Sequence, residues 1–164
     1  MKILIVGAGD VGMTVAALSS SQGHDVVLID VDRARLRAAE EALDAQVLCG
    51  DATRRSTLRE AGAPGADVVF TTTHDDQANL VAAALARQLG ARYAAARVDD
   101  PTFYDTALAI ERGILGIDAI LCAARLAASE ILRLLRLLEP AAPTSLTTTQ
   151  LQPGSMVRTI SFGR

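Results

Sequence analysis

Tryptophan is absent from this sequence of 164 residues, and aromatic side chains account for only 3% of it. Half of the residues are hydrophobic, so the core must be built mainly from Ala, Val, Leu and Ile. Such side chains suit helices packed closely on a sheet. Of the 16 basic residues, Lys2 is the only lysine, which argues against catalysis by a lysine.

Metal-ligand clusters and long apolar runs are also lacking. Cys49 and Cys122 form neither a CxxC pair nor a cluster with His24 and His74, so we expect two free buried thiols and no metal site. No apolar run approaches the roughly 18 residues of a membrane-spanning helix, and the N-terminal run does not have the form of a secretory signal. These absences predict a cytoplasmic chain.

The charge of the chain excludes one class of partner. The formal net charge of -3 is spread along the sequence, with no basic block. We therefore expect no nucleic acid and no anionic membrane surface as a direct partner.

Apolar strand-like runs alternate with helix-like segments through most of the chain. Strands are predicted over 2–6, 25–30, 46–49, 68–71, 94–98 and 117–121. Helices are predicted from the turn after the first strand to about residue 22, and over 32–43, 56–61, 75–89, 101–112 and 123–138. The first strand is continuously apolar, which is typical of burial on both faces. The pattern predicts an α/β fold: a Rossmann-like, doubly wound, mainly parallel six-stranded sheet with helices on both faces, plus a C-terminal crossover helix.

The turn after the first strand carries a GxGxxG pattern, formed by Gly7, Ala8, Gly9, Asp10, Val11 and Gly12. The first glycine allows a tight turn, the second lets a pyrophosphate approach the backbone, and the third lets the helix pack closely on the strand. The phosphate would lie on unpaired N–H groups at the positive end of the helix dipole. Alone the pattern is weak, so its meaning depends on the residues that follow.

Asp30 ends the second predicted strand, near the spacing of about 20 residues that a dinucleotide site uses. A carboxylate there can accept hydrogen bonds from both ribose hydroxyls of an adenosine, and it repels a 2′-phosphate. This favours NAD(H) or an adenine nucleotide over NADP(H), although Arg33 is an arginine of the kind that accommodates such a phosphate. The other interpretation is that Asp30 only caps the next helix, for which Asp32 is better placed.

Further polar residues follow the third, fourth and fifth strands. Asp51 and Thr53 could contact the adenine or ribose, and Thr73 with His74 could line the pocket near the pyrophosphate, because carboxyl ends of parallel strands meet at one edge. Arg97 lies in an apolar strand and needs an anionic partner. That partner is either a bound phosphate or a carboxylate among Asp51, Asp99 and Asp100.

No motif completes a catalytic site, since GxSxG, HExxH and a Walker lysine are all absent. The sequence therefore describes a nucleotide receptor better than an enzyme.

The C-terminal part has a different pattern. The segment 123–138 has an apolar stripe that is wider than a helix needs to pack on one face of a core. This favours a helix that also packs on another chain or domain. The alternative is an apolar final helix of the same domain. We expect a nucleotide-binding domain over 1–138 and a linker over 139–153. Residues 154–164 are then a strand-like tail, a possible start of a truncated or missing further domain.

These motifs together resemble the TrkA N-terminal family, also called KTN or RCK domains, over roughly residues 1–138. The resemblance rests on the glycine turn and Asp30 in their contexts, and on further matches: Cys49 to Thr53, Leu58 to Gly62, Asp75 to Leu80, Arg97, and Gly116 to Asp118.

The resemblance implies a regulatory subunit of a potassium transport system that binds NAD(H) or ATP/ADP. It implies ligand contacts from Gly7 to Val11, Asp30, Asp51, Thr53, Thr73, His74 and Arg97. It also implies homodimers or higher rings formed through 123–138, and a membrane transporter or channel subunit as partner at the inner face of the membrane. Two alternatives stay open: an NAD-dependent oxidoreductase, and a nucleotide-binding module of another transporter.

Overall fold

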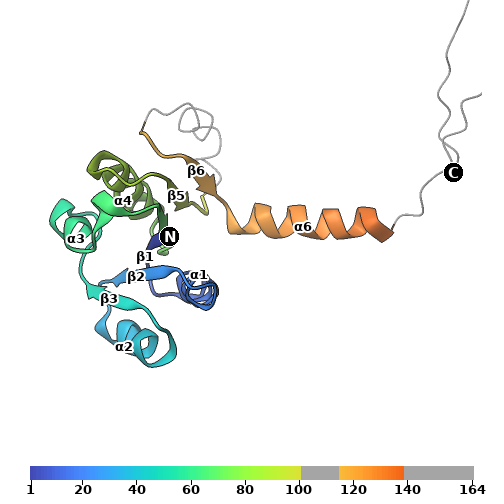
Figure 1. Ribbon diagram of the computed structural model, residues 1–164. Coiled ribbons are helices and arrows are strands. Elements are labelled where there is room, and N and C mark those ends of the chain that lie inside the picture. The colour runs from blue at the N-terminus through green and yellow to red at the C-terminus, as the bar shows by residue number, and fades with distance from the viewer. Residues whose placement is uncertain (101–114, 139–164) are drawn as a thin grey trace, which may run out of the picture. The chain divides into compact units, whose positions relative to one another are not determined.

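The computed structural model describes residues 1–100 and 115–138 (Figure 1). The expected helix over 101–112, the linker over 139–153 and the strand-like tail over 154–164 lie outside the described residues. The chain divides into two units, Met1–Ala124 and Arg125–Arg164. The elements in chain order are β1 (Lys2–Val6), α1 (Asp10–Ser21), β2 (Asp25–Asp30), α2 (Arg33–Ala42), β3 (Gln46–Cys49), α3 (Arg55–Glu60), the 3₁₀ helix η1 (Ala63–Gly65), β4 (Val68–Thr71), α4 (Asp76–Leu89), β5 (Ala94–Arg97), β6 (Ala119–Leu121) and α6 (Ala123–Leu138).

The six described strands form one sheet in the order β3-β2-β1-β4-β5-β6, and every pairing between them is parallel. Ile5 of β1 stands beside Leu28 of β2 on one side and Phe70 of β4 on the other. The strand order therefore reverses between β1 and β4, where a doubly wound sheet opens a crevice for a ligand. The predicted fold class is confirmed.

Helices cover both faces of the sheet, and each face has its own apolar cluster. Ile5 and Leu28 pack with α1 and α2, whereas Leu4 and Ile29 pack with α3, η1 and α4. All four side chains are fully buried. For Leu4 and Ile5 of β1, this burial on both faces is what the continuously apolar first strand predicted. Under α4 the core consists largely of alanine, with Ala94 and Ala96 of β5 packed against Ala82, Ala83 and Ala86 of the helix. Such small side chains let the helix lie close to the sheet.

Aspartates define the start of two helices. The Asp32 carboxylate accepts a hydrogen bond from the Ala34 N–H at 2.8 Å and caps α2. The Asp75 carboxylate accepts one from the Ala78 N–H at 2.9 Å and caps α4. Two neighbouring aspartates, Asp75 and Asp76, precede or begin this helix, and Asp75 is the one that caps it. Asp76 instead accepts hydrogen bonds from the main-chain N–H groups of Asp99 and Asp100, just after β5.

One expectation about the thiols is wrong. Cys122 is buried, but Cys49 is exposed. The reason is topological, because Cys49 ends β3, which lies at the edge of the sheet. Its Sγ–H donates to the Val31 carbonyl across a donor–acceptor distance of 3.7 Å.

Helix α6 carries exposed apolar side chains, from Leu134 at 49% to Leu137 at 69%. Its apolar residues with exposed side chains are Leu126, Ile131, Leu132, Leu134, Leu135 and Leu137. None of the helices within 1–100 and 115–138 is both long and apolar enough to cross a membrane.

Candidate functional site

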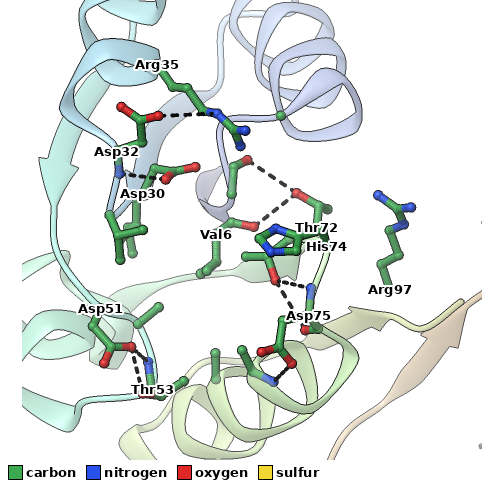
Figure 2. A pocket seen from close by; sticks show the side chains of 18 of the residues that line it. Val6, Asp30, Asp32, Arg35, Asp51, Thr53, Thr72, His74, Asp75 and Arg97 are labelled. Carbon is green, nitrogen blue, oxygen red and sulfur yellow. Dashed lines mark hydrogen bonds and ion pairs between the residues drawn. The ribbon is translucent and has the colours of Figure 1, made fainter. Parts of the chain in front are cut away.

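A cavity of about 520 Å³ lies at the carboxyl edge of the sheet, where the sheet's strand order reverses (Figure 2). Residues at or just after the ends of β1 to β5 contribute to its wall. Its volume is in the range of ordinary small-molecule sites, about 300–1,000 Å³. The lining residues are Val6, Gly7, Gly9, Asp10, Ile29, Asp30, Val31, Asp32, Arg35, Gly50, Asp51, Ala52, Thr53, Thr72, Thr73, His74, Asp75, Ala78, Ala82 and Arg97.

The glycine turn forms the centre of this wall, and two of its glycines are required by the packing. Gly7 has a φ of +102°, and a Cβ there would lie 2.9 Å from the Thr73 nitrogen. A Cβ on Gly12 would lie 1.8 Å from the Gly7 carbonyl oxygen. Gly9 has no described atom within 4 Å of its Cβ position, and no side chain of the described residues caps α1 there. The start of α1 therefore offers open main chain beside the cavity.

Asp30 connects β2 to the glycine turn. Its side chain is buried, with 9% of the residue exposed. Oδ2 accepts a hydrogen bond from the Ala8 N–H at 2.6 Å, and Oδ1 accepts one from the Asp32 N–H at 2.8 Å. Each carboxylate oxygen can accept a second hydrogen bond, so Asp30 can hold the turn and still receive ribose hydroxyls. The interpretation of Asp30 as a mere helix cap is excluded, because Asp32 caps α2.

Asp51 and Thr53 form a small hydrogen-bonded unit after β3. Asp51 Oδ1 accepts the Thr53 N–H at 2.9 Å and the Thr53 hydroxyl at 2.6 Å, and Arg54 Nε lies 3.4 Å from Oδ2. The Thr53 hydroxyl, then its N–H and Arg54, hold the pKa of the Asp51 carboxyl below its ordinary value of 3.8. Asp51 thus remains an ionised hydrogen-bond acceptor throughout the neutral range.

The far wall comes from the ends of β4 and β5. The Thr72 hydroxyl donates to the Val6 carbonyl at 3.0 Å, which holds the end of β4 against β1. Arg97 is 25% exposed in its side chain and pairs with Asp99, through Nη2 and through Nε at 3.3 Å. The carboxylate partner expected for Arg97 is therefore Asp99. Arg97 still lines the cavity, and so does the exposed His74 (Figure 2).

The structure brings most of the predicted site residues together, with three exceptions. Among the described residues, Ala8, Val11 and Gly12 do not line the cavity. Ala8 contributes its N–H to Asp30, and Gly12 packs α1 against the turn.

Three charged members of the wall were not among the predicted site residues: Asp32, Arg35 and Asp75. Arg33 was considered instead of Arg35, but Arg35 lines the cavity, with its Nε 3.6 Å from Asp32 Oδ2. The sequence contained part of the information needed to predict Arg35. With Asp32 as the helix cap, Arg35 follows three positions later, about one turn along the helix, and so lies close to Asp32.

A family model described as the TrkA-N domain matches residues 3–123. Two curated relatives are both called "Trk system potassium uptake protein TrkA homolog". The one from Archaeoglobus fulgidus is 36% identical over 135 residues, and the one from Methanothermobacter thermautotrophicus is 38% identical over 135 residues. Each alignment covers 82% of this chain, but 30% and 60% of the respective relative. The chain thus spans less than two thirds of the length of either one.

Solved structures of GsuK have the same fold. GsuK bound to ADP superposes with a TM-score of 0.64 and 29% identity, covering 84% of this chain and 34% of that one. The GsuK channel bound to NAD superposes with a TM-score of 0.62 over 73% of this chain and 21% of that one. At 20% identity, the second comparison shows the fold alone.

Proposed function

Because the chain belongs to the TrkA-N domain family, we propose that it binds an adenine nucleotide, ATP/ADP or NAD(H), and acts as a nucleotide-sensing regulatory subunit of a potassium transport system. The observation that carries the proposal is the position of Asp30. Its buried carboxylate holds the glycine turn and lines the same cavity as that turn.

The arrangement around the cavity suits each part of such a ligand. The ribose hydroxyls can bond to Asp30, and the phosphates can approach the open main chain at Gly9 at the start of α1. Asp51 and Thr53 lie beside Gly50 and Ala52 on the β3 side of the wall, where the adenine would lie. Thr73, His74 and Arg97 then surround the end of the phosphate chain. The ADP bound to GsuK, in a chain with 29% identity, supports the choice of ligand.

Regulation would follow from a difference in affinity. A nucleotide shifts the balance between two arrangements of a protein only as far as it binds one more tightly than the other. We propose that this shift changes how the subunit meets a membrane transporter or channel, with the chain at the cytoplasmic face of the membrane. The names of the two curated relatives support potassium as the transported ion. Turnover of NADH with carbonyl substrates would instead favour an oxidoreductase.

Thermal unfolding of the 164-residue chain tests the ligand. We expect ADP, ATP or NADH to raise the melting temperature, because a ligand that binds only the folded state stabilises it. NADPH is the matched control for NADH, and we expect a much smaller shift because the Asp30 carboxylate repels its 2′-phosphate. Equal shifts with NADPH and NADH would contradict the role of Asp30, and no shift with any of the adenine nucleotides would overturn the proposed function.

We also propose that α6 pairs with a second copy of the chain, because its exposed apolar side chains favour burial. Sedimentation of the wild-type chain should show a dimer. Ile131→Glu with Leu134→Glu should convert it to a monomer, because two carboxylates would have to be buried. Ser129→Glu with Arg136→Gln changes the net charge equally on the polar side of α6 and should leave the dimer intact. A wild-type monomer at high concentration would refute the pairing.

A further inference from the structure

Asn79 in the first turns of α4 has a fully buried side chain whose hydrogen bonds are all made within the protein. Its Oδ1 accepts the Thr73 N–H at 2.9 Å and the Thr73 hydroxyl at 2.8 Å. Its Nδ2 donates to the Thr73 carbonyl at 3.0 Å and to the Arg97 carbonyl at 3.0 Å. The two donors and two acceptor positions of the amide are thereby used.

These contacts replace strand pairing at the point where it stops. The pairing of β4 with β5 runs as far as Thr71 and Ala96. Beyond that point, the Asn79 amide binds the main chain of Thr73 after β4 and of Arg97 at the end of β5. A single side chain therefore sets the separation of the two strand ends.

Both strand ends belong to the wall of the cavity, whereas Asn79 does not line it in the part of the chain that the structure describes. The Thr73 main chain also packs directly on the glycine turn, since a Cβ on Gly7 would lie 2.9 Å from the Thr73 nitrogen. The position of Thr73 is thus restrained from two sides, by its hydrogen bonds to Asn79 and by its close packing on Gly7. Asp30, by contrast, is held by the main chain of Ala8 and Asp32, which Asn79 does not touch.

We propose that Asn79 is a positioning residue for the phosphate part of the nucleotide site. It contacts no ligand, but its amide holds Thr73 against the glycine turn and holds the main chain of Arg97 beside it at the end of β5. The inference rests on the proposed function. Replacing Asn79 should therefore weaken the binding of ligands that carry phosphates more than it weakens the binding of the nucleoside.

The test compares ADP with adenosine by isothermal titration calorimetry on the 164-residue chain. Asn79→Asp keeps the size of the side chain but replaces the two N–H donors of the amide by a carboxyl group, which has no N–H and offers at most one O–H donor. At least one of the carbonyls of Thr73 and Arg97 therefore loses its partner. We expect the affinity for ADP to fall by about tenfold or more, and the affinity for adenosine to change by less than about threefold. Gln77→Glu makes the same amide-to-carboxylate change at an exposed position of the same turn and should leave both affinities near the wild-type values.

A second variant, Asn79→Ser, removes the amide without adding a carboxylate, and we expect it to show the same selective loss. Equal losses for ADP and adenosine in the folded variants would overturn the inference, because Asn79 would then support the whole site. Absence of cooperative melting in both variants would overturn it too, since Asn79 would be needed for the fold itself. A wild-type chain that binds no ADP would instead refute the proposed function.

Discussion

Asp30→Ala is expected to abolish the rise in melting temperature that ADP or NADH gives to the wild-type chain. At a free ligand concentration of about 100 times the Kd, binding stabilises the folded state by about 2.7 kcal/mol, which corresponds to a shift of roughly 5–10 °C. The variant loses the acceptor for the ribose hydroxyls. It also loses the bond to the Ala8 N–H, which holds the glycine turn in place, and the local bond to the Asp32 N–H.

The variant should also melt at a lower temperature without ligand. The Ala8 N–H would lose its buried partner, at a cost of about 1–3 kcal/mol. Differential scanning fluorimetry with and without ligand separates the two effects. Asp25→Ala is the matched control, because Asp25 is exposed at the opposite end of the same strand. It should retain the ligand-induced rise, and an Asp30→Ala variant that retained the full rise would refute the ribose contact.

Gly12→Ala is expected to lower the free energy of unfolding by about 3 kcal/mol or more, the upper end of overpacking effects. The added methyl group would lie 1.8 Å from the Gly7 carbonyl oxygen and 2.9 Å from the Thr72 hydroxyl oxygen. The first of these is main chain at the base of the turn, so relief requires α1 to move away from β1. Urea denaturation measures the loss.

Gly9→Ala provides the contrast within the same turn. Gly9 has a φ of -82°, and its Cβ position is open, so the variant should keep its stability or gain up to about 1 kcal/mol. Because Gly9 lines the cavity, its methyl group should block the close approach of the phosphates and weaken ADP binding. Equal stability losses in the two variants would contradict the packing role of Gly12, and unchanged ADP affinity in Gly9→Ala would contradict phosphate binding at the turn.

Much of the fold could be predicted because its signals are local. The run from Lys2 to Val6 is continuously apolar and so marks a strand buried on both faces. Asp32 precedes a helical period, and glycine turns mark where strands and helices end. The site could be predicted in outline for a related reason, since parallel strands bring their carboxyl ends to one edge and every polar residue after a strand becomes a candidate.

The details of the site depended on how the elements pack and on which of several carboxylates a side chain contacts. Whether Arg33 or Arg35 lines the cavity depends on the rotation of α2 relative to the sheet, and Arg97 could have paired with any of several carboxylates. The exposure of Cys49 follows from the edge position of β3, which no local pattern shows.

The sequence by itself therefore determined the class of fold, the edge of the sheet at which the cavity lies and several of the residues along it, because periodicity and turn residues act over a few positions. Only the tertiary structure decided the strand order, the partners of Asp30 and Arg97, and the contacts of Asn79. Asn79 lies 18 residues before Arg97 in the chain, and its amide reaches the Arg97 carbonyl only because α4 and β5 pack together. Such hydrogen bonds depend on packing between elements, so they leave no periodic trace in the sequence.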